Sequence, residues 1–340
     1  MNADFIERIV RQVNFLTINK NHLIIDADTH PSDLELLSGS ILDKYNRTPN
    51  YYHGRPVSGD DLLREMRMAR VDMALIWQNP AATPYTTDQN ENYNRLLKAN
   101  EYIFKLGQSY PEKFIPGGWT DPKALGLDKA LKIVDIFMDE FGFLVVKMNP
   151  AQNAFPIDSE EVITIVDKIS KNKGIAAFHY GADTPYTPAS GLEKIARSFP
   201  DTRIIGIHMG GGGASYNEGE ELYNQTRELG LKYPNLFFVQ SAKRDTHIES
   251  DFITYTLEGK PFNKNIACAS DAPYGRQTWN YGGYRMMFES LLNSGEHTDE
   301  RVRNNPEAFN EDMQKNYMGR NLAELIIDGY KIKFPQLFEN

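Results

Sequence analysis

The chain has 340 residues, with 37 lysine and arginine residues against 46 aspartate and glutamate residues, and one cysteine. The net charge of −9 argues against nucleic acid and against an anionic membrane surface as partners, because both select basic proteins. A single cysteine excludes a disulfide framework and fits a reducing compartment, so we expect a cytoplasmic protein.

The first residues predict an amphipathic helix and not a signal peptide. Phe5, Ile9 and Val13 recur at helical spacing, and charged residues interrupt any continuous apolar segment. We expect residues 1–20 to pack as a helix on the rest of the chain or on a partner subunit. In the second case the protein would be a homodimer. Residues 21–330 are expected to form one catalytic domain, and residues 331–340 a C-terminal tail. Nowhere does an apolar run reach the length of about 18 residues that predicts a membrane-spanning helix.

Short apolar runs and segments of helical spacing alternate through the rest of the chain. The predicted strands are Leu23–Asp26, Met73–Trp77, Phe114–Gly117, Phe143–Lys147, Ile175–Phe178, Ile204–Ile207, Leu236–Val239 and Ile266–Ala269. The predicted helices are Leu62–Ala69, Tyr93–Ser109, Leu127–Glu140, Glu160–Ser170, Gly191–Ser198, Glu220–Leu231 and Met286–Leu292. Most strands are continuously apolar, which is typical of parallel strands covered on both faces.

This alternation predicts βα units with right-handed crossovers. Eight such units fit a closed (β/α)8 TIM barrel better than an open doubly wound sheet. Two long irregular segments, 31–59 and 80–88, follow the first two strands. In a barrel such loops lie at the carboxyl ends of the strands, where they form the substrate pocket.

Residues of the metal-binding type follow four of the predicted strands. Asp28 and His30 follow the first strand, His179 the fifth, His208 the sixth and Asp271 the eighth. Because parallel strands deliver their carboxyl ends to one rim, we expect these side chains to converge. Imidazole and carboxylate ligands without thiolates suit a divalent ion such as Zn²⁺, Mn²⁺ or Fe²⁺. Cys268 lies inside the last strand and is expected to be buried and inert.

The segments that carry these residues resemble the amidohydrolase superfamily, in the branch called the amidohydrolase-related or amidohydrolase 2 family. They are Ile-Asp-Ala-Asp-Thr-His (25–30), Phe-His-Tyr-Gly (178–181), Ile-His-Met-Gly-Gly (207–211), Ala-Ser-Asp-Ala-Pro-Tyr (269–274) and Tyr-Met-Gly-Arg-Asn-Leu-Ala-Glu-Leu (317–325). The resemblance covers roughly residues 23–327. It implies a distorted (β/α)8 barrel with one divalent metal ion, most often Zn²⁺.

By this resemblance the metal ligands are Asp28, His30, His179 and Asp271. Asp28 departs from the histidine that many superfamily members have at this position. A harder oxygen ligand there makes Mn²⁺ the alternative to Zn²⁺.

Three residues receive roles from geometry and charge beside the implied metal. Asp271 is the candidate general acid and base. His208 is either a further ligand or, in our preferred interpretation, a hydrogen-bonding electrophile next to the substrate oxygen. Lys147 matches the position of the carbamylated lysine of binuclear relatives, but we favour an ion-paired lysine or a contact to an anionic substrate.

A weaker set of residues follows the same strand ends. Candidate substrate contacts besides Lys147 are Tyr180, Tyr274, Arg276 and Trp279. The glycine run 210–213 either presents backbone N–H groups to an anion or is a flexible loop. We interpret the other four histidines, His22, His53, His247 and His297, as structural.

These residues predict a metal-dependent hydrolase of a small amide, ester or lactone, with water activated by the metal and Asp271. The alternative is a non-oxidative decarboxylase of a small aromatic or unsaturated carboxylic acid, in which Asp271 protonates carbon. Decarboxylases of the family tend to have an acidic residue soon after the sixth-strand His-Met-Gly, where this chain has glycines, which tilts the prediction toward hydrolysis. A third interpretation is a barrel that binds metal without turnover.

Overall fold

The protein is a (β/α)8 barrel, as the sequence predicts. The structure, a computed structural model, describes residues 3–181, 185–211, 221–243, 245–258 and 264–339. All eight predicted strands are present within a residue or a few of their expected bounds. The strands are β1 (Ile25–Thr29), β2 (Met73–Ile76), β3 (Phe114–Pro116), β4 (Gly118–Trp119), β5 (Val145–Met148), β6 (Ile175–His179), β7 (Ile204–Ile207), β8 (Leu236–Gln240) and β9 (Ile266–Cys268).

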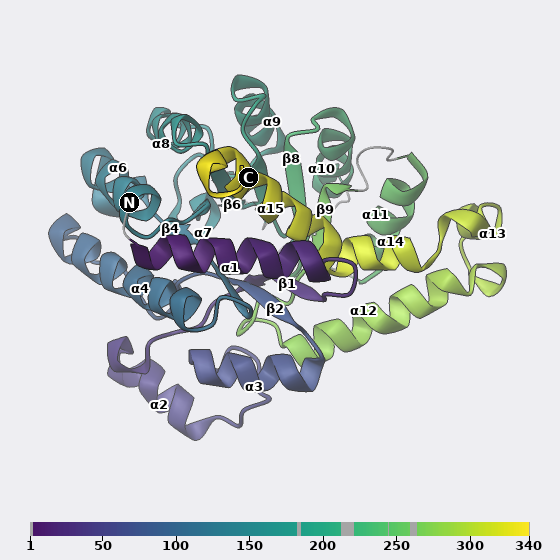
Figure 1. Ribbon diagram of the computed structural model, residues 1–340, viewed down its shortest axis with the longest axis horizontal. Helices are drawn as coiled ribbons and strands as arrows, with labels where there is room; N and C mark the ends of the chain where they lie inside the picture. The colour runs from purple at the N-terminus through teal and green to yellow at the C-terminus, as the bar shows by residue number, and fades with distance from the viewer. Residues whose placement is uncertain (1–2, 182–184, 212–220, 244, 259–263, 340) are drawn as a thin grey trace.

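Helices surround the strands on the outside of the barrel (Figure 1). The longer ones are α1 (Ala3–Asn19), α2 (Gly39–Arg47), α3 (Gly59–Ala69), α4 (Gln89–Ser109), α6 (Leu127–Asp135), α8 (Glu160–Lys171), α9 (Ala189–Ser198), α10 (Glu221–Lys232), α11 (Asp245–Glu258), α12 (Gln277–Leu292) and α15 (Asn321–Lys333). The shorter ones are α5 (Pro122–Leu125), α7 (Pro150–Asn153), α13 (Glu300–Arg303) and α14 (Glu311–Lys315). Single turns of tighter or wider helix occupy Leu34–Leu36, Ile136–Glu140, Ser294–Glu296, Pro306–Ala308, Asn316–Arg320 and Pro335–Leu337. Across the described residues, no helix has both the length and the apolar character that crossing a membrane requires.

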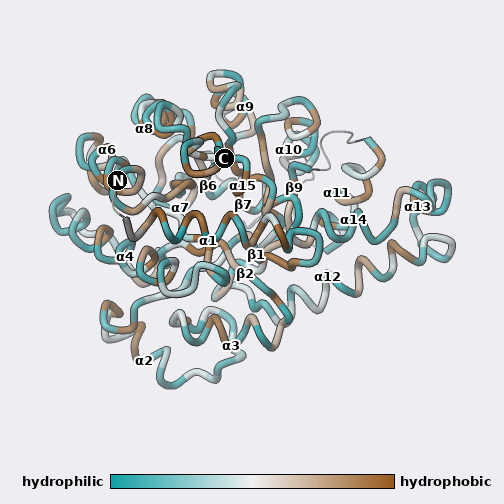
Figure 2. The backbone as a smooth tube through the Cα atoms, viewed as in Figure 1, coloured by the Kyte–Doolittle hydropathy of each residue, from teal (hydrophilic) through white to brown (hydrophobic). Residues whose placement is uncertain are grey.

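All neighbouring strands pair in parallel, in the orders β1-β2-β3 and β4-β5-β6-β7-β8-β9. A side chain at Gly117 would collide with the Trp77 ring. Gly117 alone separates β3 from β4, so the two are parts of one interrupted strand. The described strand segments therefore fill the eight positions of the barrel. Every residue of β2 and of β7 is buried, which explains why these strands read as apolar runs without alternation. Figure 2 shows the apolar residues concentrated on the strands and on the inner sides of the helices.

The barrel closes between its first and last strands. Thr29 at the end of β1 forms a parallel bridge with Ala272, and the His30 amide donates a hydrogen bond of 2.6 Å to the Ala272 carbonyl oxygen. The closure brings residues near the two ends of the sequence to the same point on the rim.

Several helices differ from the expectation, among them α2, α11 and α12, and the sequence also did not predict α15. Helix α2 lies within the segment 31–59 that reads as irregular, and its residues are only partly buried or exposed. Helix α11 was not predicted because it is buried on most of its surface and therefore shows no apolar stripe. Helix α12 begins nine residues before the predicted start, since Gly282 and Gly283 interrupt the helical pattern.

Helix α1 lies across the barrel beside α15, as the purple and yellow ribbons of Figure 1 show. Its buried face carries Phe5, Ile9 and Val13. The Arg8 side chain is 3% exposed and donates hydrogen bonds to the carbonyl oxygens of Phe141 (3.0 Å) and Gly142 (2.8 Å) and to the Tyr330 hydroxyl. A buried guanidinium thus fixes the helix to the rest of the chain.

We expect Arg8→Ala to lower the free energy of unfolding by about 2–3 kcal/mol, because buried acceptors lose their charged donor. Arg11→Ala is the matched control, since its pair with Glu112 is exposed and worth less than about 1 kcal/mol. Urea unfolding followed by circular dichroism measures both losses. Equal losses for the two variants would contradict this account of α1.

Candidate active site

The carboxyl ends of the strands gather the predicted metal ligands around one cavity. Asp28 lies in β1, His30 directly after it, His179 at the end of β6, and Asp271 in the turn after β9. One ligand atom from each of Asp28, His30 and Asp271 can be chosen so that all lie within 4.8 Å of one another. His30 Nε2 is 3.4 Å from Asp28 Oδ1 and 3.6 Å from Asp271 Oδ1.

The cavity has a volume of about 210 Å³. Its lining joins strand-end residues with loop residues, namely His30, Pro80, Trp119, Lys147, Asn149, Gln152, His179, His208, Ala242, Asp271 and Tyr274. Imidazole, carboxylate and amide groups outnumber apolar ones, so the space is suited to a cation and a polar small molecule.

Two atoms of this cluster that could bind a metal ion have no hydrogen-bond partner among the described residues. Asp28 Oδ2 and His179 Nε2 are buried and have no hydrogen bond to any described residue. His30 Nδ1 is 2.9 Å from the Gln78 carbonyl oxygen, so Nδ1 carries the proton and the Nε2 lone pair faces the cluster. Leaving buried polar atoms unsatisfied is costly unless a ligand completes them. The residues present therefore fit a divalent cation held by imidazole and carboxylate groups.

Lys147 places a buried ammonium group beside these ligands. Its Nζ lies 2.7 Å from Asp28 Oδ1 and 3.4 Å from His30 Nε2, and 5.2 Å from the ring centroids of Trp77 and Trp119. The side chain is 1% exposed. Lys147 is thus ion-paired within the site and adds positive charge to the cavity that it lines.

Burial dominates the ionisation of the site. It lowers the pKa of His30, lowers that of His179 strongly, and lowers that of His208 to about 4, which keeps the three rings neutral. For Asp28, burial raises the pKa, but the Lys147 ammonium, His30 and His208 together outweigh burial and hold the pKa well below its usual value. Burial and the neighbouring Asp28 carboxylate raise the pKa of Asp271 well above its usual value.

Asp26 connects the two segments that supply the carboxylates. Its Oδ1 accepts hydrogen bonds from the Ser270 amide (2.9 Å) and the Asp28 amide (3.3 Å), and its Oδ2 accepts from Ser270 Oγ (2.5 Å) and Gln277 Nε2 (2.9 Å). Asp271 itself has φ of 58°, a left-handed conformation that a side chain rarely adopts. The Asp26 hydrogen bonds thus hold β1 against the segment that presents Asp271.

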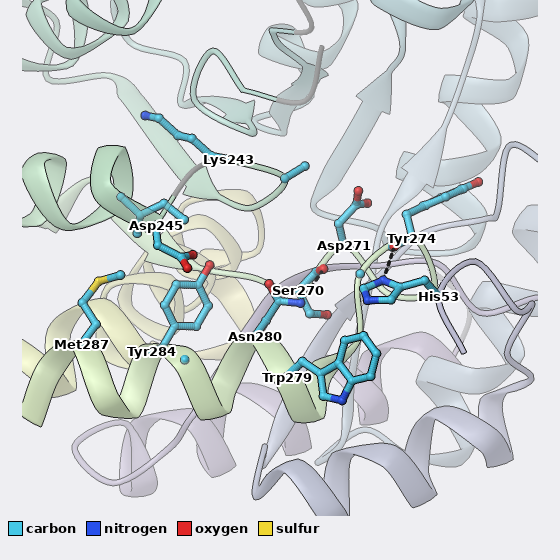
Figure 3. Close-up of a pocket in the computed structure, with 14 residues that line it drawn as sticks. His53, Lys243, Asp245, Ser270, Asp271, Tyr274, Trp279, Asn280, Tyr284 and Met287 are labelled. Carbon is cyan, nitrogen blue, oxygen red and sulfur yellow. Dashed lines mark hydrogen bonds between the residues drawn. The ribbon is translucent and has the colours of Figure 1, made fainter. Parts of the chain in front are cut away.

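A wider chamber of about 540 Å³ adjoins the cavity, and Ala242, Asp271 and Tyr274 line both spaces. Figure 3 shows His53 and Trp279 on one side of this chamber and Asp245, Tyr284 and Met287 on the other. The rings of His53 and Trp279 lie 4.4 Å apart, and His53 Nδ1 donates to the Tyr274 carbonyl oxygen at 3.1 Å. His53, which the sequence indicates as structural, therefore lines the path to the cavity.

Two of the predicted substrate contacts lie elsewhere. Tyr180 is fully buried behind His179, because successive side chains of an extended strand point to opposite faces, and its hydroxyl bonds to Thr226 Oγ1 at 3.1 Å. Arg276 is buried at the start of α12 and pairs with Glu65 at 2.6 Å. Neither residue lines the cavity or the chamber.

Sequence analysis missed residues that the structure places in or beside the cavity. Asn149 and Gln152 line it, with a hydrogen bond of 2.7 Å between Asn149 Nδ2 and Gln152 Oε1. Asn149 stands two residues after Lys147, a spacing that could have indicated it. Ser241 follows β8 and contacts His208, but serine at a strand end gives no distinctive signal.

Part of the glycine run after β7 is described. Gly210 has φ of 84°, and a side chain at Gly181 would collide with the Gly211 carbonyl oxygen, so the loops after β6 and β7 approach closely. Gly212 and Gly213, and with them the predicted anion contact, lie outside the described residues.

Comparisons with known proteins agree with this architecture. The sequence profile described as Amidohydrolase matches residues 25–292, and the chain belongs to this family. A search of curated proteins by sequence finds no match.

Solved structures share the fold at low sequence identity. The 5-carboxyvanillate decarboxylase of Novosphingobium aromaticivorans, with bound manganese and 3-methoxy-4-hydroxy-5-nitrobenzoic acid, is 13% identical, with a TM-score of 0.62 over 90% of this chain and 97% of that one. The 2,6-dihydroxybenzoate decarboxylase from Rhizobium is 13% identical, with a TM-score of 0.53 over 84% and 98%. The 4-oxalomesaconate hydratase of Rhodopseudomonas palustris is 15% identical, with a TM-score of 0.53 over 92% and 98%. At these identities the likeness establishes the fold.

We expect Asp26→Asn to lower the free energy of unfolding by about 1–3 kcal/mol. The asparagine NH2 group would face hydrogen-bond donors where the wild-type protein has an accepting carboxylate oxygen. Asp60→Asn, at an exposed position of α3, serves as the control and is expected to change stability by less than about 0.5 kcal/mol. Chemical denaturation of the two variants tests this difference. A fully stable Asp26→Asn protein would show that Asp26 does not secure the closure.

Proposed function

We propose that the protein is a metal-dependent, non-oxidative decarboxylase of a small aromatic or unsaturated carboxylic acid. The observation that carries the proposal is the group of Asp28, His30 and Asp271 ligand atoms beside the unpartnered His179 Nε2. Structures of the same fold include decarboxylases of small aromatic acids, which favours this activity over the hydrolysis expected first from the sequence.

Asp28, His30, His179 and Asp271 would hold one divalent cation. Zn²⁺ suits the two imidazoles, whereas two carboxylates and the manganese in a structure of similar fold favour Mn²⁺. A bound divalent cation would supply Lewis acidity, withdrawing electron density from the substrate oxygens next to the reacting carbon.

The protein's own residues would orient the acid and move one proton. Lys147 and the amide side chains of Asn149 and Gln152 line the cavity and favour an anionic substrate. Asp271 would give a proton to the carbon that bears the carboxylate. The bond to the carboxylate then breaks, carbon dioxide leaves, and the electron pair of that bond stays with the ring or the double bond. Solvent returns the proton to Asp271.

Hydrolysis of a small amide, ester or lactone is the second candidate. In that reaction Asp271 would take a proton from the attacking water and pass it to the leaving group. The glycines at 210–213, where decarboxylases of the family tend to have an acidic residue, favour this candidate.

The chamber beside the cavity is the proposed route for the substrate. Tyr274 and Trp279 are 37% and 54% exposed and flank the chamber, so an aromatic acid would contact them before it reaches Asp271. We keep the cytoplasm as the proposed compartment, because the one cysteine, Cys268, is buried and unpaired. The proposed partner is a small molecule, and a homodimer is the alternative to a monomer.

The first test measures products and metal together. We expect the purified protein to bind about one equivalent of Mn²⁺ or Zn²⁺ and to release carbon dioxide from a panel of hydroxylated benzoic acids. Asp271→Asn should lower kcat by at least about 100-fold, the usual contribution of a general acid. Asp328→Asn, an exposed change on α15, is the control and should leave kcat unchanged.

Acid production from lactones or amides, without carbon dioxide release from any carboxylic acid, would favour hydrolysis. Full activity in Asp271→Asn would contradict both candidate reactions.

The second test addresses the chamber. We expect Trp279→Ala to raise KM about tenfold with little change in kcat, because the ring contributes binding area and no chemistry. Met286→Ala, on the same helix and 72% exposed outside the chamber, should leave KM unchanged. Steady-state kinetics on the best substrate distinguish the two. A loss confined to kcat would place Trp279 in the chemical step instead.

A further inference from the structure

Three side chains at the ends of adjacent strands form a continuous hydrogen-bonded chain. His179 Nδ1, at the end of β6, lies 3.2 Å from His208 Nε2 after β7. His208 Nδ1 lies 2.8 Å from Ser241 Oγ after β8. All three residues are buried, and the exposed fraction of Ser241 is 1%.

The proton positions along this chain follow from one condition. If His179 binds a cation through Nε2, its ring proton must be on Nδ1, because a neutral imidazole carries one proton. His179 then donates to His208 Nε2, which must be an acceptor. The single proton of His208 is left on Nδ1 and is donated to Ser241 Oγ.

We propose that His208 is a positioning residue that accepts the His179 Nδ1 proton, and that Ser241 fixes the tautomer in which it can do so. The inference rests on the proposed function only in taking His179 as a metal ligand. It replaces the sequence-based expectation that His208 donates to a substrate oxygen, because its Nε2 is an acceptor already in use and its Nδ1 proton is directed to Ser241.

The backbone around His208 supports a fixed position for this ring. His208 and Met209 both have positive φ, at 75° and 45°, so the chain turns sharply after β7. The Met209 carbonyl oxygen accepts a hydrogen bond of 3.2 Å from Lys243 Nζ, and the Met209 sulfur lies 3.0 Å from Gln240 Nε2. Lys243 and Gln240 also bind the buried Asp251 carboxylate.

This buried group ties the turn that carries His208 to β8 and α11. Lys243 therefore has a structural role, and its side chain is fully buried although the residue borders the chamber. The His208 ring is therefore held on both sides, by the Met209 turn and by Ser241.

Metal affinity separates the positioning role from a catalytic one. His208→Gln places an amide oxygen near the position of Nε2 and keeps an acceptor for His179, whereas His208→Leu fills similar space without one. We expect the dissociation constant for Zn²⁺, measured by competition with a chromophoric chelator, to rise about 10–100-fold in His208→Leu and less than about threefold in His208→Gln. Ser241→Ala should give an intermediate rise. Thermal unfolding of each metal-free variant identifies any protein that has failed to fold.

A second measurement needs no substitution. Nitrogen NMR of histidine-labelled, Zn²⁺-loaded wild-type protein reports which ring nitrogen carries the proton, and we expect Nδ1 for both His179 and His208. A proton on His208 Nε2, or equal affinity losses in His208→Gln and His208→Leu, would overturn this inference and leave the proposed function standing. Failure of the wild type to bind any divalent cation would overturn both.

Discussion

Asp26 lies fully buried where β1 meets the segment after β9, and both of its oxygens accept hydrogen bonds across that joint. Burial raises the pKa of this carboxyl to about 7, and the donors around it limit the rise. This joint closes the barrel and thereby fixes the distance between residues 28–30 and residue 271. The group of Asp28, His30 and Asp271, the small cavity and the chamber beside it all depend on that closure.

The charge inside the cavity differs from the charge of the whole chain. The net charge of −9 is that of the whole chain, whereas the cavity pairs Asp28 with Lys147 and adds neutral imidazoles. A divalent cation would make this interior positive, so an anionic substrate can bind to an acidic protein. Lys147 also acts on the site itself, because its ammonium is the main group that lowers the pKa of the buried Asp28 carboxyl.

Sequence analysis succeeded where a position in the chain dictates a position in space. Parallel strands end on one rim, so Asp28, His30 and Asp271 lie together as expected and His179 lines the same cavity, while their role as metal ligands stays a prediction. It failed where the direction of a side chain depends on a shift of one residue along the strand, or where a side chain is paired with a residue distant in the sequence. Tyr180 is next to His179 yet points to the opposite face, and Arg276 is near Tyr274 yet is occupied by Glu65.

The contacts of single polar residues also could not be predicted from the sequence. Ser241 acquires its importance only from the position of His208, which depends on a turn with positive φ that no residue pattern predicts. Helix α11 escaped prediction because burial on several sides removes the periodicity on which such predictions rest.

The central claim is that four side chains in or just after β1, β6 and β9 hold one divalent cation. A crystal structure of Mn²⁺-loaded protein, with anomalous scattering measured at the manganese edge, tests it directly. The account predicts one anomalous peak in the cavity, with the Nε2 atoms of His30 and His179 at coordination distance, about 2.0–2.3 Å. An empty cavity at saturating Mn²⁺, or a peak outside the cavity alone, would contradict it.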